Sequence, residues 1–296
     1  MSASPRSVAV VGVGRMGGAM AARFAGAGHK VTVWNRDRAK ADRVAEATGA
    51  GIAQSAADAA ARAEVVVSSL ADDDAVKAVY LGPTGIVEGI GDDSIAVDTS
   101  TVDPETIMEV GAAIDEEGSG FLDCPVSGSV ATVEAGALTI MAGGDADLIS
   151  AVEGVLGAIG SKVIRVGPRG TGAAAKLAVN GLVHGLNIAL SEALVLAETA
   201  GISRDVAYEI FASGAGGAPF VHYKREAYLH PDETPVAFSL DLVAKDLTLI
   251  TAMAKRVGAP MRQASVGLDV VNEAIGSGLG HRDLSAIAVH LRARGA

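Results

Sequence analysis

The sequence predicts an α/β fold, in which a doubly wound, mainly parallel sheet has helices on both faces and is followed by an all-α domain. Three observations predict it. Over residues 7–166, short apolar runs alternate with helical segments, which is typical of parallel sheets. The first of these runs leads directly into a glycine turn. Beyond Gly170 the alternation stops, and residues 171–199 form one long helical segment. We therefore expect two domains, residues 1–166 and 167–296, linked by the long helix.

The glycine turn has the spacing of a dinucleotide site. The β-branched run at residues 8–11 meets a G-x-G-x-x-G sequence with no spacer, and a helix and a second strand at residues 31–34 follow. Gly12 permits the tight turn, Gly14 lets a pyrophosphate approach the backbone, and Gly17 lets the helix pack close to the strand. Free N–H groups at the helix N-terminus favour phosphates. A purely structural glycine turn is the alternative. The residues expected to contact the cofactor are Gly12, Val13, Gly14, Arg15, Met16 and Gly17.

The end of the second strand favours NADP over NAD. An NAD site usually carries Asp or Glu about twenty residues after the turn, on the ribose 2′-hydroxyl. This chain has Asn35 there, followed by Arg36 and then by Asp37 and Arg38. A carboxylate would repel a 2′-phosphate, whereas the planar guanidinium of Arg36 matches phosphate oxygens. Asp37 keeps open the alternative that both arginines are ordinary solvated loop charges.

The first domain continues in the same alternation. A helix from Arg38 stops at Gly49, and the apolar run that begins at Glu64 reads as a buried strand. Pro104 in the first turn, with Glu105 beside it, indicates a helix start. The helical segments expected in order are 38–48, 58–62, 74–81, 104–117 and 145–159, and the strands are 64–70, 94–98, 120–123, 138–142 and 162–166.

Ligands of such sheets bind at the carboxyl ends of the strands. That rule brings three short segments into one neighbourhood: Leu70 with Ala71, Ser100 with Thr101, and Ser127 with Gly128 and Ser129. We expect Leu70 and Ala71 on the cofactor side of this neighbourhood.

Helices alone are expected beyond the sheet, at about residues 203–211, 240–257, 263–276 and 283–291, with a glycine-rich loop at 213–219. The long helix is apolar or small over most of its circumference, which is typical of a buried helix. A polar stripe nevertheless runs along it at steps of four, four, three and four: Lys176, Asn180, His184, Asn187 and Ser191. A buried lysine without a partner is costly, so we expect Lys176 and Asn180 to be site residues. His184 and Asn187 are interpreted as structural or interface groups.

Composition narrows the function class. The chain carries a net charge of -11 with five Phe, four Tyr and one Trp, which argues against nucleic acid as a partner. No apolar run is expected to reach the roughly eighteen residues needed to span a bilayer. The single cysteine, Cys124, excludes an internal disulfide, and we find no metal-ligand spacing. Cys124 is interpreted as an apolar pocket-wall residue rather than a reactive thiol. We expect a cytoplasmic protein that self-associates as a homodimer or homotetramer through its helical domain.

These motifs together resemble the β-hydroxyacid dehydrogenase family, which includes 3-hydroxyisobutyrate dehydrogenase, tartronate semialdehyde reductase, NADPH-dependent glyoxylate/succinic semialdehyde reductases and, more distantly, 6-phosphogluconate dehydrogenase. The resemblance covers almost the whole chain. It depends on five motifs in order: residues 12–17, residues 98–101, residues 123–128, Gly170-Thr171-Gly172 with Lys176 and Asn180, and Phe238 with Lys245-Asp246-Leu247. It implies a Rossmann-type domain and an all-helical one.

The resemblance also implies site roles. The lysine matching Lys176 is the acid/base, and the asparagine matching Asn180 helps to hold the substrate. The pair matching Ser127 and Gly128 binds the substrate carboxylate, the residue matching Thr101 contacts the nicotinamide half, and the lysine matching Lys245 lies over the cofactor. Asn35 and Arg36 resemble the NADP-using members. Two departures concern the substrate pocket: the second asparagine of many members is Val179 or Gly181 here, and their alanine before the proline is Cys124.

The implied reaction moves hydride between a nicotinamide and the carbinol carbon of a short β-hydroxy acid or semialdehyde. An alcohol releases hydride only if its hydroxyl proton also leaves, so Lys176 is expected to accept that proton in oxidation and to donate it in reduction. One alternative is an imine reductase, which shares the architecture but usually has Asp or Tyr at the lysine position. Another is a non-catalytic NADP-binding scaffold. The identity of the acid and the direction in the cell are left open.

Overall fold

The computed structural model describes residues 4–295 and divides the chain into two compact units, one ending at Lys176 and the other starting at Leu177. Residues 1–3 and 296 of the predicted domains lie outside the described part. The division between the units falls inside the long helix α8 (Thr171–Thr199). The domain limits at 166 and 167 stay a prediction.

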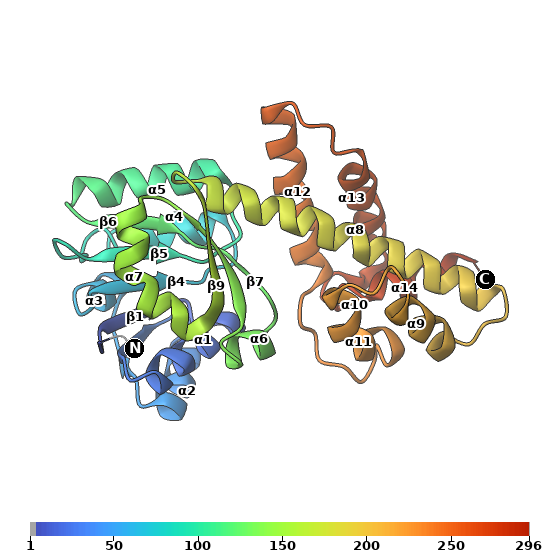
Figure 1. Cartoon of the computed structure of the whole chain (residues 1–296), viewed down its shortest axis with the longest axis horizontal. Helices are drawn as coiled ribbons and strands as arrows, with labels where there is room; N and C mark the ends of the chain where they lie inside the picture. Colours follow the sequence, from blue (N-terminus) through green and yellow to red (C-terminus); the bar gives the residue numbers. More distant parts are fainter. Residues whose placement is uncertain (1–3, 296) are drawn as a thin grey trace. The chain divides into compact units, whose positions relative to one another are not determined.

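The first unit is built on one mixed, mainly parallel sheet (Figure 1). Its strands follow the order β3-β2-β1-β4-β5-β6-β8-β7, with β9 paired to β8. All neighbours from β3 to β6 run parallel, as does the β8–β9 pair, whereas β8 is antiparallel to β6 and β7. The strands are β1 (Ser7–Val11), β2 (Lys30–Trp34), β3 (Gly51–Ile52), β4 (Val65–Ser68), β5 (Ile95–Asp98), β6 (Gly120–Asp123), β7 (Val126–Ser127), β8 (Leu138–Gly143) and β9 (Gly160–Gly167).

Helices cover both faces of this sheet, which confirms the doubly wound prediction (Figure 1). One core contains apolar side chains of α1, α2, α6 and α7, and the opposite core contains those of α3, α4 and α5. The central strands are valine-rich and buried on both faces, as parallel strands between two helical layers must be. The helices are α1 (Arg15–Gly26), α2 (Arg38–Thr48), α3 (Ala56–Ala60), α4 (Asp73–Leu81), α5 (Pro104–Glu116), α6 (Val130–Glu134) and α7 (Ala146–Ile159).

Four short elements of the first unit differ from the prediction. The helical segment expected at residues 58–62 is α3 instead, because the Ser55 hydroxyl accepts from the Asp58 N–H and starts the helix earlier. Strand β3, and the antiparallel strand β7 and helix α6 between β6 and β8, were not predicted from the sequence. Apart from them, the predicted alternation of strands and helices is confirmed.

The second unit is helical and contains most of α8 (Figure 1). Its other helices pack around one core that includes Leu194, Tyr208, Tyr228, Leu247 and Ile287. Two short helices, at residues 219–223 and 225–229, lie in a stretch for which no helix was predicted from the sequence. The helices are α9 (Arg204–Ser213), α10 (Pro219–Tyr223), α11 (Arg225–Leu229), α12 (Leu240–Val257), α13 (Arg262–Ala274), the π-helical turn η1 (Ile275–Leu279) and α14 (Ala286–Gly295). The last helix starts at Ala286 rather than at Asp283, because the Asp283 carboxylate binds Lys224 and nearby backbone N–H groups.

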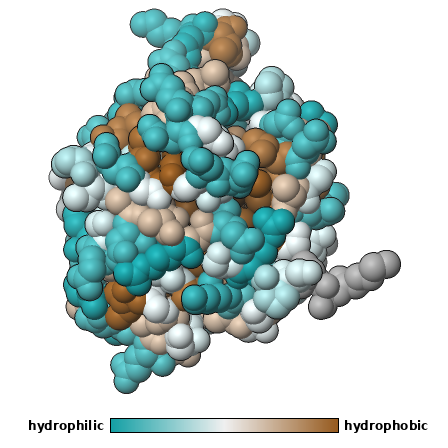
Figure 2. Space-filling model, turned by 90° about the vertical axis from the view of Figure 1, so that its left-hand side faces the viewer, coloured by the Kyte–Doolittle hydropathy of each residue, from teal (hydrophilic) through white to brown (hydrophobic). Residues whose placement is uncertain are grey.

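By length and composition alone, α8 could cross a membrane, with a mean hydropathy of 1.4 in its most apolar window. Half of that window is buried inside the structure, as in the core helix of a globular protein. The face of the molecule shown in Figure 2 mixes many hydrophilic side chains with scattered hydrophobic patches. Neither observation requires a membrane.

Candidate active site

The strand order of the first sheet contains a reversal point, which is where dinucleotides bind in open parallel sheets. The chain runs from β1 through β2 to β3 in one direction, returns to β4, and continues to β5 and β6 in the other. The turn after β1 and the turn after β4 therefore leave the sheet side by side at its carboxyl edge. Ligands of open parallel sheets bind at such a reversal point.

The glycine turn fits a pyrophosphate. Gly12 has a φ of +90°, and a Cβ there would lie 2.8 Å from the Leu70 side chain. A Cβ on Gly17 would collide with the Gly12 carbonyl, so α1 packs tightly against the turn. A Cβ on Gly14 would meet nothing within 4 Å. The N-terminus of α1 has no side-chain cap, which leaves backbone N–H groups to bind phosphate oxygens.

Asn35 joins the glycine turn to the loop after β2. Its Oδ1 accepts from the Val13 N–H at 3.1 Å, and its Nδ2 donates to the Asp37 carbonyl at 3.0 Å. The Asp37 carboxylate caps α2 by accepting from the Ala39 N–H. Asn35 therefore has a structural role in addition to any contact with the cofactor.

The two arginines of this loop differ. Arg38 pairs with Asp42 at 2.8 Å. Arg36 is exposed, and among residues 4–295 no carboxylate lies within ion-pair distance of it. Arg36 therefore has no ion-pair partner among the described residues, and it follows Asn35, which is bonded to the glycine turn.

A buried polar row lies beneath the carboxyl edge, and the sequence did not reveal it. Ser68, Asp98 and Asp123 end β4, β5 and β6 and are neighbours in register. The Asp98 carboxylate accepts from the Ser68 hydroxyl at 2.5 Å and from the Ser100 N–H at 2.9 Å, and Ser68 also bonds the Tyr80 hydroxyl. Burial raises the pKa of Asp98 to about 6, although these hydrogen bonds oppose the rise.

Asp98 also connects the row to the cofactor side. The Ser100 hydroxyl donates to Asp98 at 3.0 Å and accepts from the Leu70 N–H at 2.9 Å. Ser100 thus links the segment after β4 to the segment after β5 by hydrogen bonds. These are the segments in which we expect Leu70, Ala71 and Thr101 to bind the cofactor. Thr101 is half-buried and Ala71 is exposed, and their roles stay predictions.

Asp123 fixes the start of α8. Its two carboxylate oxygens accept from the Gly170 N–H at 2.9 Å and the Ala173 N–H at 2.8 Å. Burial raises the pKa of Asp123 despite these bonds. Because Lys176 lies in the same first turns of α8 and is half-buried, this capping carboxylate sets where the lysine leaves the first unit. The acid/base role of Lys176 stays a prediction.

The predicted residues that follow β6, from Cys124 to Ser129, differ in burial and in the contacts they make. Cys124 is fully buried and burial raises the pKa of its thiol, as expected for a wall residue rather than a nucleophile. Ser127 is half-buried and Gly128 is exposed with a φ of +145°. The Ser129 hydroxyl is engaged in a capping box with Thr132 at the start of α6. The role of Ser127, Gly128 and Ser129 in binding substrate stays a prediction.

In the second unit, Asp246 binds several of the expected polar residues. Its Oδ2 accepts from Asn180 Nδ2 at 2.6 Å and lies 3.3 Å from His184 Nε2, and its Oδ1 lies 3.0 Å from Lys245 Nζ. Burial alone would raise the pKa of Asp246, but the His184 hydrogen bond and the Lys245 charge outweigh it, and that pKa is lowered. The sequence motif included Asp246 but did not identify its central role.

The rest of the polar stripe on α8 is structural, as predicted for Asn187. The Asn187 amide donates to the Leu284 carbonyl at 3.1 Å and accepts from the Tyr228 hydroxyl at 2.6 Å. Ser191 donates to the Asn187 carbonyl within the same cluster. A second buried pair, Lys224 with Asp283 at 2.8 Å, anchors the backbone before α12.

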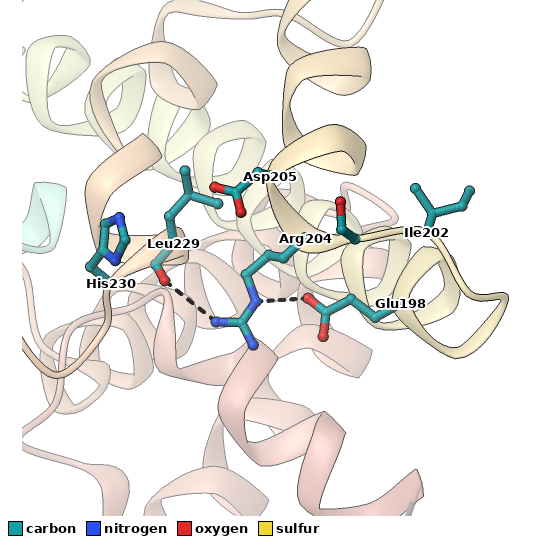
Figure 3. Close-up of a pocket in the computed structure, with 7 residues that line it drawn as sticks. Glu198, Ile202, Arg204, Asp205, Leu229 and His230 are labelled. Carbon is teal, nitrogen blue, oxygen red and sulfur yellow. Dashed lines mark hydrogen bonds and ion pairs between the residues drawn. The ribbon is translucent and has the colours of Figure 1, made fainter.

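Two hollows lie away from these groups. One is shallow and is formed by the end of α8, the start of α9 and the end of α11, where Arg204 donates to Glu198 and to the Leu229 carbonyl (Figure 3). The other lies near Lys30 and Gly51, at the amino edge of the first sheet. Neither contains a predicted site residue. His222 and His230 are both exposed.

Comparisons with known protein families agree with this geometry. The family model of the NAD binding domain of 6-phosphogluconate dehydrogenase matches residues 7–167. The model of the NAD-binding region of NADP-dependent 3-hydroxyisobutyrate dehydrogenase matches residues 170–291. Together the two models cover both units.

Individual proteins are similar over nearly the full chain. Glyoxylate/succinic semialdehyde reductase 1 of Arabidopsis thaliana is 34% identical over 95% of this chain and 96% of its own length. A structure of Mycobacterium tuberculosis 3-hydroxyisobutyrate dehydrogenase with L-serine is 29% identical, with a TM-score of 0.85 over 98% of this chain and 100% of that one. An imine reductase from Pseudomonas sp. is 21% identical with a TM-score of 0.65, over 97% of this chain and 100% of its own, and shares the fold.

Proposed function

Because the chain belongs to the β-hydroxyacid dehydrogenase family, we propose that it moves hydride between NADP and a short β-hydroxy acid or the corresponding semialdehyde, with Lys176 as acid/base. Its class, an NAD(P)-dependent β-hydroxyacid dehydrogenase, follows from the family. The observation that carries the proposal is the glycine turn at the reversal point of the sheet, with open space at Gly14 and with Arg36, which pairs with no carboxylate of residues 4–295, in the loop bonded to the turn.

The preference for NADP is supported by what the loop after β2 contains. Its one carboxylate, Asp37, is used to cap α2, and Arg38 is paired with Asp42, so Arg36 is the cation left to bind a 2′-phosphate. A guanidinium can hold phosphate oxygens with two parallel hydrogen bonds. Leu70, Ala71, Thr101 and Lys245 complete the cofactor contacts in this proposal.

Lys176 is proposed to move the proton. When bound, the nicotinamide supplies or accepts hydride at its ring. In reduction, the ammonium of Lys176 stabilises the negative charge that develops on the carbonyl oxygen and donates its proton there. In oxidation, the neutral amine accepts the hydroxyl proton. Half-burial of the side chain limits solvent around this exchange.

The substrate is proposed to carry a carboxylate. Ser127, Gly128 and Ser129 follow β6, and Ser127 and Gly128 offer backbone N–H groups and the Ser127 hydroxyl for an anion, whereas the Ser129 N–H donates to the Thr132 hydroxyl. Asn180 is the second polar contact in this proposal. The related reductase of Arabidopsis is named for glyoxylate and succinic semialdehyde, which are short carbonyl compounds with a carboxylate. Orientation by such contacts can supply a large part of the rate enhancement.

We further propose that the protein is cytoplasmic and forms a homo-oligomer through its helical unit. The support for self-association is the exposed apolar face of α8, where Leu182 is 67% and Leu196 is 72% exposed. Large exposed apolar side chains on a long helix usually mark an interface.

The proposal is tested by oxidation of NADPH and of NADH in the presence of glyoxylate, succinic semialdehyde and methylmalonate semialdehyde, with cyclic imines as the comparison. We expect turnover of at least one carboxylate-bearing aldehyde. Lys176→Ala should lower kcat by about 10²- to 10⁴-fold. Lys176→Arg should not restore it, because a guanidinium does not release its proton. Turnover of imines alone, or full activity in Lys176→Ala, would overturn the proposal.

A further inference from the structure

A buried carboxylate in the second unit holds two of the proposed site residues. Asp246 is fully buried, accepts from the Asn180 amide at 2.6 Å through Oδ2, and faces the Lys245 ammonium at 3.0 Å through Oδ1. Hydrogen bonds to a carboxylate are short and strong. An amide held through its Nδ2 also has its Oδ1 direction fixed, because the two atoms share one plane. The position of Asp246 therefore decides how Asn180 presents its acceptor.

His184 is the third group on this carboxylate. Its Nε2 lies 3.3 Å from Asp246 Oδ2, and because an ionised carboxylate only accepts, Nε2 is the donating nitrogen. The side chain is 2% exposed. Its ring lies 6.0 Å from the Phe238 ring at a tilt of 33°.

The other nitrogen of His184 explains why the contact with Asp246 matters. Nδ1 is buried and has no hydrogen-bond partner among the residues the structure describes. A buried polar atom left without a partner costs stability, so packing alone would favour an apolar side chain at this position. The hydrogen bond to Asp246 is the feature that only a donor such as histidine can supply.

We propose that His184 is a positioning residue for the substrate site: its Nε2 fixes the Asp246 carboxylate, and Asp246 fixes the amide of Asn180. Asn180 lies one helical turn after Lys176 on α8, so a rotation of its amide alters the polar surface next to the acid/base. His184 acts through Asp246 and needs no contact with substrate. The inference rests on the proposed role of Asn180 in holding the substrate.

Two substitutions separate positioning from packing. His184→Phe keeps a flat ring beside Phe238 but removes the donor. His184→Gln places an amide N–H near the position of Nε2 and should rescue the contact. We expect His184→Phe to raise KM for the aldehyde substrate about tenfold, the loss equivalent to one hydrogen bond, with a smaller change in kcat. His184→Gln should stay within about threefold of the wild type.

Ser191→Ala is the matched control, because it removes a buried hydrogen bond on the same helix outside the Asp246 cluster. It should lower Tm without changing KM. If His184→Phe leaves KM unchanged, or if His184→Gln raises KM as much as His184→Phe does, the positioning role is wrong.

A second measurement works without turnover. The side-chain amide resonances of Asn180, observed in asparagine-labelled protein, should move in His184→Phe and stay near their wild-type positions in His184→Gln. Unmoved resonances in His184→Phe would overturn the inference whether or not the enzyme is active. A wild-type protein that reduces none of the aldehydes contradicts the proposed function instead, so the two failures are distinguishable.

Discussion

Arg36 lies in the loop after β2 and Arg38 is the first residue of α2, yet of the two only Arg38 has a carboxylate partner among residues 4–295. If the unpaired guanidinium binds a 2′-phosphate, Arg36→Ala should raise KM for NADPH by about 10- to 100-fold, the range expected for lost charge-assisted hydrogen bonds. KM for NADH should change little. Steady-state kinetics with both coenzymes measures this. Arg38→Ala is the control, and equal effects of Arg36→Ala on both coenzymes would remove the proposed NADP preference.

Asp98 makes stability depend on pH. Burial raises its pKa in the folded protein to about 6, against an ordinary value of 3.8. The folded state therefore keeps a proton that the unfolded state has lost. This contribution to stability is complete below about pH 4 and is lost as the pH rises through about 6, with a total of about 3 kcal/mol.

Asp98→Asn should remove this dependence, because an amide does not titrate. The free energy of unfolding of the variant minus that of the wild type should increase by about 3 kcal/mol from pH 4 to pH 7. This increase does not depend on how stable the variant is at pH 4. Urea unfolding at several pH values measures the difference. Parallel stability curves for the two proteins would contradict the raised pKa.

At the scale of elements, the helices and strands predicted from the sequence are those long enough for the period of their apolar residues to be recognised. The strand, glycine turn and helix at the start, and the long helix α8, were all recognisable from spacing and periodicity. Strand β7 has two residues and helix α6 has five, which is too short for either period to show. The glycine-rich turn was readable because its residue types are dictated by backbone geometry.

The site was predictable only in part for a related reason. Lys176 and Asn180 stand out as polar residues in an apolar helix. The contacts of Asp98, Asp123 and Asp246 depend instead on strand register and on helix packing between residues far apart in the chain. No local pattern distinguishes such an acid from one at an ordinary strand end or on a helix surface.

The link between β6 and α8 gives a test at this scale. Asp123→Ala removes both acceptors from the Gly170 and Ala173 N–H groups and leaves these donors buried. We expect a loss of about 2–3 kcal/mol in the free energy of unfolding, measured in urea. We also expect a lower kcat, because the first turns of α8 carry Lys176. Asp123→Asn keeps one acceptor and should be intermediate, whereas wild-type stability in Asp123→Ala would show that another group starts the helix.

At the scale of the whole molecule, the exposed face of α8 has its own spacing. Exposed Leu182, Ala189 and Leu196 alternate with half-buried Leu186 and Ala193 at steps of four, three, four and three, the period of a helix–helix seam, and Leu186 also packs against the core of its own unit. The polar stripe bonded to the helical unit lies on other positions of the same helix. The polar side chains on one side of α8 thus form hydrogen bonds within the chain. On the other side, Leu182 and Leu196 are 67% and 72% exposed. A second copy of the helix matches this seam in both period and chemistry.

If two copies pair along this seam, introducing carboxylates into it should separate them, because a carboxylate buried against leucine has no hydrogen-bond or ion-pair partner. The double substitution Leu182→Glu and Leu196→Glu should therefore lower the molar mass measured by light scattering toward that of one 29.6 kDa chain. Val257→Glu is the matched control, since Val257 is also 67% exposed but lies at the end of α12. The control should keep the wild-type mass. An unchanged mass in the double variant would place any interface elsewhere, and a wild-type protein that is already monomeric would rule out the seam as a contact between copies.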